Sequence, residues 1–463
     1  MGECFCVYIP NSIDYVVAFL GIVSAGGIVT TANPSYTAEE LQHQLNDSSA
    51  VYLLAAESNI QKAMKVKQSV LSLKEIFVLG NDEECCSRFS DLLEDDGSFF
   101  HKPVSVQPRE MPLVLPYSSG TTGLPKGVIL THHNIISIIH QMTHPDIFPL
   151  TTEDVVLGVL PFFHCFGLVL VSLCSVIRGC PVVVMSRFKP ELFLTAIQQY
   201  KVTVILLAPP IAHFLVESPL VDKYDLSSVT TILSGAAALH PQVAVKLQTK
   251  FPSARIGQGY GMTEVSPVAC VPLVGQTLYE SVGVPVPATR MKIVSISGGA
   301  TLGPGEKGEI LISGPQVMKG YLNNPEATSL TIDEDGWLHT GDVGFYTEDK
   351  NFYLVDRIKE LIKYKGHQVA PAELELLLMK HPSICDAAVV GVPDPRVGDL
   401  ARAFVVIKPS HDDITPQCVQ EFIAEHVASY KHLHGGIEFV DHIPRNASGK
   451  ILRRKLRAKI FPK

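Results

Sequence analysis

The sequence predicts an α/β protein: a large domain of parallel and mixed sheets with helices and a β-rich subdomain, followed by a small α+β domain. Three observations support this prediction. Strand-like apolar runs alternate with helix-like segments over the first half of the chain. The 463 residues exceed what one hydrophobic core usually supports. Beyond residue 360 the pattern changes to short helices mixed with short strands.

The composition excludes several classes of protein. With 46% hydrophobic and 18% charged residues, the chain can bury a large core and is not disordered. A formal net charge of -8 argues against a nucleic-acid partner. The ten cysteines show no C-x-x-C spacing, so we interpret them as reduced, mostly buried thiols of an intracellular protein. The longest apolar runs, 16–32 and 165–185, contain glycines; each indicates a core helix followed by a strand, not a transmembrane segment.

The first elements follow a β–α rhythm. The run Phe5–Ile9 predicts a strand, and Ser12 is a plausible N-cap of the helix that follows. Further strands are predicted at 51–55, 76–79 and 182–185. Residues 81–101 are acidic and rich in turn formers, which indicates a solvated loop with a short helix.

A loop rich in glycine and hydroxyl groups lies between two predicted buried strands, 112–116 and 128–130. From Tyr117 to Gly127 it reads YSSGTTGLPKG. Its backbone N–H groups and hydroxyls can bind phosphate oxygens, and Lys126 adds a positive charge, so we predict a polyphosphate ligand. It is not a Walker A loop, because Pro125 precedes the lysine and a strand follows. An ordinary surface turn is the alternative interpretation.

This stretch resembles the nucleotide-binding signature of the adenylate-forming superfamily, which includes acyl-CoA synthetases, 4-coumarate:CoA ligases and beetle luciferases. Four later motifs match the family in the same order, so the resemblance covers essentially the whole chain; they read QGYGMTE at 258–264, WLHTGD at 337–342, DRIKELIKYKG at 356–366 and PRNASGK at 444–450. The resemblance implies an enzyme that activates a carboxylic acid with ATP and transfers it to coenzyme A. It also implies Mg²⁺ and a mobile small domain.

Two predicted strands, 202–207 and 229–233, end in small residues, which leave room for a flat ligand at the edge where open α/β sheets bind ligands. Another predicted strand leads into PFFHCFG at 161–167. On its own, His164 is more often a satisfied core histidine than a functional one. The resemblance implies that His164 and the residues after it form a wall of the acyl pocket, and that adenine lies beside residues 234–238.

In the motif at 258–264, the glycines permit close approach to a purine, and Tyr260 offers an aromatic face. Their spacing does not fit G-x-G-x-x-G, so a dinucleotide fold is disfavoured. Thr263 can donate to a phosphate, and Glu264 can bind Mg²⁺. Taken alone, Glu264 would most often be a surface carboxylate.

The later motifs supply charged groups. A carboxylate such as Asp342 at a strand end can accept both ribose hydroxyls. By resemblance, Arg357 reaches the ribose, Lys359 is the pivot of a hinge, and Lys450 is the adenylation catalyst. The basic tail after residue 452 would by itself suggest a solvated helix or an anionic partner.

The resemblance therefore implies a full set of site residues. The catalytic residues are Lys450, Lys363, His164 and Thr263. The residues that bind ATP or coenzyme A are Ser118, Ser119, Gly120, Thr121, Thr122, Lys126, Arg187, Ala236, Gln258, Gly259, Tyr260, Asp342, Arg357, Lys359, Lys365, Gly366 and Gln368. The acyl pocket includes Phe166, Leu170 and Gly261, and Glu264 binds the metal.

We predict three parts: an adenylation domain at 1–355, a hinge at 356–360 and a small domain at 361–463. In the small domain, helices are predicted at 371–380 and 416–428, and strands at 387–392 and 401–407. We expect a monomer that uses a small-molecule acid, ATP and coenzyme A. The C-terminus is not of the Ser-Lys-Leu type, so a cytoplasmic location is favoured over a peroxisomal one.

The expected function is an acyl-CoA ligase for a hydrophobic acid, either an aryl-propenoic acid or a medium- or long-chain fatty acid. A luciferase-like oxygenase is one alternative, but luciferases have two successive histidines where this chain has Phe163 before His164. A catalytically inactive nucleotide-binding fragment is the other. Phe166 and Leu170 stand where plant 4-coumarate ligases have polar groups, so we expect unsubstituted aromatic or aliphatic acids to be preferred.

The first predicted strand begins almost at Met1, whereas relatives carry several tens of residues before it. We therefore expect a shortened chain. Its large domain would expose apolar surface, and its solubility, stability and activity would be lower than those of its relatives.

Overall fold

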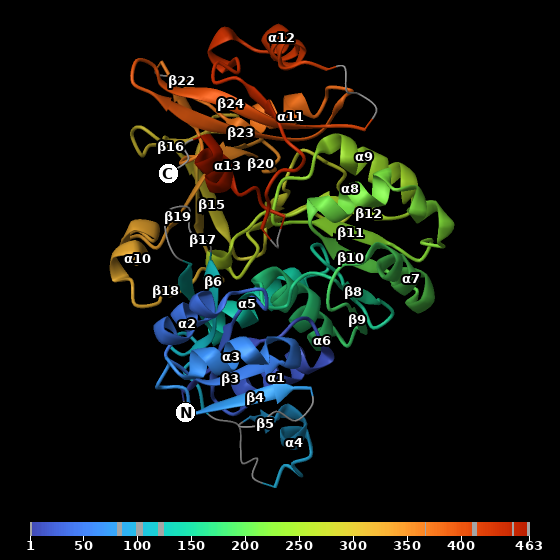
Figure 1. The fold of residues 1–463 in the computed structure, drawn as a ribbon, viewed down its shortest axis with the longest axis vertical. Coiled ribbons are helices and arrows are strands. Elements are labelled where there is room, and N and C mark those ends of the chain that lie inside the picture. Colours follow the sequence, from blue (N-terminus) through green and yellow to red (C-terminus); the bar gives the residue numbers. More distant parts are fainter. Residues whose placement is uncertain are drawn as a thin grey trace. The chain divides into compact units, whose positions relative to one another are not determined.

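The computed structural model describes residues 2–80, 86–98, 105–118, 125–365, 367–409, 414–446 and 449–460. Its residues fall into two compact units, which are described separately below. Unit 1 comprises residues 1–279, 283–290 and 312–338, and unit 2 comprises 280–282, 291–311 and 339–463. Figure 1 labels the elements of both.

The first sheet of unit 1 has eight strands in the order β18-β7-β6-β2-β1-β3-β4-β5. Their bounds are β1 (Cys4–Tyr8), β2 (Ile28–Thr31), β3 (Ala50–Ala56), β4 (Glu75–Leu79), β5 (Ser87–Arg88), β6 (Pro112–Ser118), β7 (Lys126–Thr131) and β18 (Gly320–Tyr321). The strands β1 to β6 are parallel, while β7 is antiparallel to both β6 and β18. The glycine-rich segment thus lies between two strands, as predicted, but these strands are antiparallel, whereas the sequence rhythm suggested parallel ones.

Helices cover both faces of this sheet, and side-chain alternation along β1 explains why. Cys6 and Tyr8 point into a core shared with α2 and α3, whereas Val7 points into a core shared with α1 and α5. The helices are α1 (Ile13–Ser24), α2 (Ala38–Asp47), η1 (Glu57–Asn59), α3 (Ile60–Lys67), α4 (Phe89–Leu93) and α5 (His132–Met142). The Ser12 hydroxyl accepts a hydrogen bond from the Tyr15 N–H at 3.1 Å, which confirms the predicted N-cap.

The second sheet of unit 1 is entirely parallel, in the order β12-β11-β10-β8-β9. Its strands are β8 (Val156–Gly158), β9 (Val182–Val184), β10 (Val204–Leu207), β11 (Thr231–Ser234) and β12 (Arg255–Gln258). Such sheets are buried on both faces. Accordingly, Leu206 packs in the core that also holds the helix after His164, and Leu207 packs against α7, α8 and α9.

The connections of this second sheet are helical (Figure 1). They comprise the π-helix η2 (Phe166–Leu173), α6 (Cys174–Arg178), α7 (Pro190–Tyr200), α8 (Pro209–Glu217), η3 (Pro219–Lys223) and α9 (Pro241–Lys250). The short helix η4 (Thr263–Val265) follows the last strand, β12. Unit 1 also contains a two-stranded ribbon, β13 (Cys270–Val271) with β14 (Val284–Pro285), and the helix α10 (Pro325–Thr331). The helix-then-strand interpretation of 165–185 is confirmed, but its π-helical start was not predicted.

Unit 2 contains two further sheets. The first has the order β16-β15-β17-β19-β20, with bounds β15 (Arg290–Val294), β16 (Thr301–Leu302), β17 (Gly308–Ser313), β19 (Leu338–Tyr346) and β20 (Phe352–Arg357). The second has the order β22-β21-β24-β23, with β25 beside β24; its strands are β21 (Ile362–Tyr364), β22 (His367–Val369), β23 (Ile384–Asp394), β24 (Gly398–Ile407) and β25 (Ile437–Phe439).

Helices cover both faces of the second sheet of unit 2. They are α11 (Pro371–Leu378), α12 (Pro416–His426), η5 (Ser429–Lys431) and α13 (Arg453–Ile460). Leu374 of α11 and Ile423 of α12 pack in one core, and Leu456 of α13 packs in the other. The α/β prediction is therefore confirmed, including the α+β character of the C-terminal segment. In the part of the chain that is described, no helix is long and apolar enough to cross a membrane.

Candidate active site

A pocket of unit 1 opens at the carboxyl ends of β10, β11 and β12, the edge at which ligands bind to open parallel sheets. It encloses about 590 Å³ of empty space, part of it open to solvent. Of the residues predicted for the site, His164, Phe166, Leu170, Ala236, Gly259, Tyr260 and Gly261 line it. Sequence reasoning missed Met142, Phe148, Leu206, Leu233, Val268 and Val271, which are ordinary core residues until the fold brings them together.

Two glycines of the pocket are fixed by close packing. A Cβ atom on Gly261 would lie 1.9 Å from the Pro267 carbonyl oxygen, where no side chain fits. A Cβ on Gly235 would lie 2.8 Å from the ring of Phe166. At these two positions the packing therefore leaves no room for a larger side chain.

His164 lies in the turn before the π-helix η2, and its imidazole carries no positive charge at neutral pH. Its Nδ1 atom accepts a hydrogen bond from the Phe166 N–H at 3.3 Å. Burial lowers the pKa of His164 to about 4. The pocket wall that this histidine shares with Phe166 and Leu170 is therefore electrically neutral and mostly apolar, which suits an uncharged hydrophobic group.

Glu264 is almost fully buried, with 6% of its surface exposed. Its Oε1 atom accepts hydrogen bonds from the Ser118 hydroxyl at 3.0 Å and from the Tyr321 hydroxyl at 2.9 Å. Among the described residues, both of these partners are neutral hydroxyls, and neither brings a positive charge to the carboxylate. An oxygen ligand that keeps its negative charge is what Mg²⁺ requires, so this residue fits the predicted metal role.

Lys126 lies near the same tyrosine, Tyr321, that donates to Glu264. Its Nζ atom lies 4.9 Å from the centroid of the Tyr321 ring. Ser118 and Lys126 are the last residue of β6 and the first of β7, so they flank the glycine-rich segment. The other predicted phosphate-binding residues of that segment, Ser119, Gly120, Thr121 and Thr122, lie outside the described residues.

Three further predicted residues of unit 1 differ in their surroundings. The Gln258 side chain makes two hydrogen bonds to the backbone. Its Oε1 accepts from the Leu239 N–H at 2.9 Å, and its Nε2 donates to the Tyr279 carbonyl at 2.8 Å. Thr263 is buried at the start of η4, one residue before Glu264. Arg187 is exposed, just beyond β9.

In unit 2, Asp342 and Arg357 face each other across β19 and β20, and their Oδ1 and Nε atoms are 3.0 Å apart. Within β19, the residue before Asp342 is held by Glu309, whose Oε1 accepts from the Gly341 N–H at 3.0 Å. Gly341 has a φ of +69°, a left-handed conformation that favours glycine. This hydrogen bond to Glu309 holds the strand segment next to the carboxylate that the sequence assigned to a ribose.

Lys450 belongs to unit 2 and interacts electrostatically with both of these residues. Its N–H donates to Asn446 Oδ1 at 2.9 Å, and its carbonyl accepts from the Asn446 N–H at 2.9 Å. Burial lowers the pKa of Lys450 to about 8; the positive charge of Arg357 adds to this effect, and Asp342 opposes it. Three residues that are far apart in sequence are therefore brought together.

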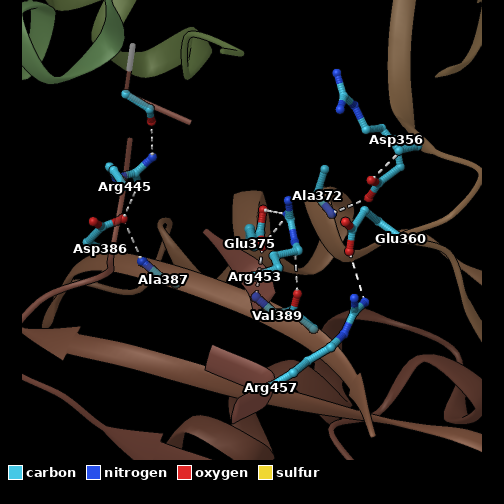
Figure 2. A network of polar contacts seen from close by, with 12 residues as sticks. Asp356, Glu360, Ala372, Glu375, Asp386, Ala387, Val389, Arg445, Arg453 and Arg457 are labelled. Carbon is cyan, nitrogen blue, oxygen red and sulfur yellow. Dashed lines mark hydrogen bonds and ion pairs between the residues drawn. The ribbon is translucent and has the colours of Figure 1, made fainter. Parts of the chain in front are cut away.

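Two ion pairs tie the C-terminal helix to other parts of unit 2, one to α11 and one to the predicted hinge segment 356–360 (Figure 2). Arg453 of α13 donates to both carboxylate oxygens of Glu375, at 2.6 and 2.8 Å, and Arg457 pairs with Glu360 at 2.9 Å. Asp356 Oδ2 accepts from the Ala372 N–H at 2.7 Å. The basic tail is therefore not only a solvated helix, because two of its arginines pair with acidic residues within unit 2.

The predicted coenzyme A residues of the β21–β22 hairpin are exposed. Lys363 lies opposite Gln368, and Lys365 adopts a left-handed φ of +49°. Gly366 lies outside the described residues. Lys359 is exposed in the turn between β20 and β21.

Comparison with known proteins gives concordant matches. The AMP-binding enzyme family matches residues 1–322, and the AMP-binding enzyme C-terminal domain matches residues 373–450. The chain is 43% identical to 4-coumarate–CoA ligase 2 of Petroselinum crispum, over 99% of this chain and 85% of that protein. It is also 43% identical to a probable 4-coumarate–CoA ligase 1 of Dictyostelium discoideum, over 98% and 85%.

Solved structures agree with these matches. ATP-bound MatB from Rhodopseudomonas palustris has a TM-score of 0.91 at 25% identity, covering 100% of this chain and 89% of that one. The anthranilate CoA ligase AuaEII in complex with anthranoyl-AMP has a TM-score of 0.90 at 27% identity, covering 99% and 88%.

Proposed function

Because the chain belongs to the AMP-binding enzyme family, we propose that it is an acid–thiol ligase that couples a carboxylic acid to coenzyme A with cleavage of ATP to AMP. One observation carries this proposal. The apolar pocket at the carboxyl ends of β10 to β12 is lined by Gly261 and Met262, and the segment they begin leads directly to the buried carboxylate of Glu264. A site for a hydrophobic acid thus adjoins a site for a cation that would accompany a polyphosphate.

The chemistry follows from the poor electrophilicity of a carboxylate. A carboxylate oxygen attacks the α-phosphorus of ATP, the bond to the bridging oxygen of the β-phosphate breaks, and pyrophosphate leaves. The sulfur of coenzyme A then attacks the acyl carbon, forms the thioester and releases AMP, while the thiol proton passes to solvent. The protein contributes mainly position and charge in the first step.

We assign roles to the residues in line with the sequence. Ser118 and Lys126, with the segment between them, would bind the polyphosphate, and Asp342 and Arg357 would bind the ribose. Lys450 would stabilise the charge that develops between carboxylate and α-phosphate. Glu264 would hold Mg²⁺, which when bound neutralises phosphate charge. The exposed residues Lys363, Lys365 and Gln368 would serve the coenzyme A step.

The pocket lining favours an apolar substrate. The wall formed by Phe166, Leu170, Met142 and Phe148 offers no hydrogen-bond partner to a ring hydroxyl, so a phenol placed against it would lose its water at a cost of about 1–3 kcal/mol; His164 and Ser234 line other parts of the pocket. We therefore expect a higher kcat/KM for cinnamate or medium-chain fatty acids than for 4-coumarate. The names of the relatives favour 4-coumarate itself, which makes that acid the competing candidate.

Thioester formation with ATP and coenzyme A, measured over a panel of acids, tests both the ligase activity and the preferred substrate. Thioester and AMP with any hydrophobic acid support the ligase. A preference for 4-coumarate over cinnamate would overturn the assigned substrate but not the ligase. Consumption of oxygen with the acyl-adenylate would instead favour a luciferase-like oxygenase, and no turnover with any acid would favour an inactive nucleotide-binding protein.

A further inference from the structure

We propose that Tyr321 is a positioning residue that holds the Glu264 carboxylate and the Lys126 ammonium in place for the metal and the polyphosphate. The inference rests on the proposed function, which gives these two charges their ligands. Tyr321 itself lies outside all the motifs that the sequence singled out. Its link to Glu264 spans 57 residues along the chain.

The first contact is the hydrogen bond from the Tyr321 hydroxyl to Glu264 Oε1, at 2.9 Å. The Ser118 hydroxyl donates to the same oxygen at 3.0 Å. From the described residues no hydrogen bond goes to Oε2, so the two donors orient the carboxylate and leave its other oxygen for a cation.

The second contact is between the Tyr321 ring and Lys126, whose Nζ atom lies 4.9 Å from the ring centroid. A cation over an aromatic face is attracted without being neutralised. Among the described residues, no ion pair joins Lys126 to Glu264. One side chain therefore contacts both charges and keeps them from cancelling each other, so that one remains available to a metal and the other to a phosphate.

The backbone explains why Tyr321 can serve this purpose. In the short strand β18 it lies opposite Val128 of β7, two residues after Lys126. Its N–H donates to the Thr328 hydroxyl at 2.9 Å, and the Leu322 N–H donates to the Gly127 carbonyl at 2.8 Å. The tyrosine is thus fixed to the strand that carries Lys126, and its orientation does not depend on a flexible loop.

The test measures binding of α,β-methylene-ATP, which cannot react, by calorimetry with and without Mg²⁺. Wild type should bind more tightly with Mg²⁺. Tyr321→Phe removes only the hydroxyl, so it should reduce that Mg²⁺ enhancement about tenfold, the scale of one hydrogen bond to a charged group, and leave Mg²⁺-free binding within about twofold. Tyr321→Leu also removes the ring, so it should weaken Mg²⁺-free binding as well.

The matched control is Tyr8→Phe. The buried Tyr8 hydroxyl also donates one hydrogen bond, but to the Tyr36 carbonyl, at 2.9 Å, and not to Glu264. This variant should leave the Mg²⁺ enhancement unchanged whatever it does to the melting temperature. Ser118→Ala provides a second variant, which removes the other donor to Oε1 and should act in the same direction as Tyr321→Phe.

The possible outcomes distinguish a failure of the metal role of Glu264 from a failure of the positioning role of Tyr321. If wild type shows no Mg²⁺ enhancement, the metal role of Glu264 in the proposed function is wrong. If wild type shows it and Tyr321→Phe retains it in full, the positioning role is wrong. Equal weakening of Mg²⁺-free and Mg²⁺-bound affinity in Tyr321→Phe would also overturn the inference, because it would indicate a general structural defect. A folded Ser118→Ala variant decides the case if Tyr321→Phe does not fold.

Discussion

Glu264 in unit 1 and Glu375 in unit 2 are both buried glutamates, but their partners differ in charge. Glu264 accepts hydrogen bonds from two neutral hydroxyls, those of Ser118 and Tyr321. Glu375 accepts two hydrogen bonds from Arg453, in a pair whose side chains are only 13% and 14% exposed, and a third from the Val389 N–H (Figure 2).

This difference separates two uses of a buried carboxylate. Where the partner is an arginine, the charge is compensated within the protein and the pair anchors α13 to α11. Where the partners are hydroxyls, the carboxylate is oriented but its charge is left for a ligand. We infer that Glu264 has a functional role and that Glu375 has a structural one. The variants of Glu264, Glu375 and Arg453 below test that distinction.

The largest effect is expected for Glu264→Gln. A unit charge about 4 Å from its ligand, at an effective dielectric constant near 20, contributes about 4 kcal/mol, so the adenylation rate should fall by about 10²–10³. The free energy of unfolding should change little, since glutamine can still accept from both hydroxyls. Single-turnover adenylation and urea unfolding of the same sample check this. A large loss of stability together with retained adenylation would reverse the assignment of the two glutamates.

Arg453→Met should show the opposite pattern. It leaves the Glu375 carboxylate buried without its cation, which should cost about 3–5 kcal/mol of unfolding free energy. Burial already raises the pKa of Glu375, and loss of the arginine would raise it further. Because this folded pKa would then lie above the unfolded one, the variant should regain stability as the pH falls and the carboxyl group takes up a proton.

The matched double variant, Arg453→Met with Glu375→Leu, removes both charges and should recover most of that stability. Urea unfolding at several pH values provides the measurement. If the single variant is as stable as wild type at neutral pH, the pair is not an anchor and the structural half of the comparison fails.

A smaller effect is expected from the pH dependence that Lys450 imposes. Its pKa is lowered to about 8, so the ammonium is charged at pH 7 and loses its proton as the pH rises through that value. If the charge supports adenylation, kcat/KM should fall about tenfold per pH unit on the alkaline side. Lys450→Arg keeps the positive charge, because arginine stays protonated at alkaline pH. In this variant the alkaline fall of kcat/KM should therefore move beyond the measured pH range. An unchanged alkaline fall in that variant would mean that another group titrates.

The smallest effect is expected at the surface. Lys65 pairs with Glu39 at 3.4 Å, but the side chains are 69% and 75% exposed, so solvent screens the pair. Lys65→Ala should leave both unfolding and adenylation within experimental error. A loss comparable with that of Arg453→Met would show that exposure does not distinguish the ion pairs of this protein.

Sequence reasoning predicted the elements well where periodicity is local. The strands around the glycine-rich segment, the cap at Ser12 and the helix α11 all follow from neighbouring residues. Glu264, Asp342 and Lys450 were found because motifs carry them, and the structure brings the last two together with Arg357.

The remaining features depend on contacts between distant parts of the chain, which no local pattern encodes. Tyr321 is an ordinary strand residue until β18 pairs with β7, and Arg453 is one of several basic residues until α13 packs over β23. The π-helix after His164 could not be predicted from the sequence either, because its apolar run fits an α-helix just as well.

Exchange of labelled pyrophosphate into ATP, without coenzyme A, tests the central claim most directly. It reports reversible formation of an acyl-adenylate and requires only the acid, ATP and Mg²⁺. We expect exchange that depends on a hydrophobic carboxylic acid and that is lost in Glu264→Gln but retained in Arg453→Met at a temperature where that variant is folded. Exchange that is independent of any acid, or release of ADP in place of AMP when coenzyme A is added, would contradict the central claim.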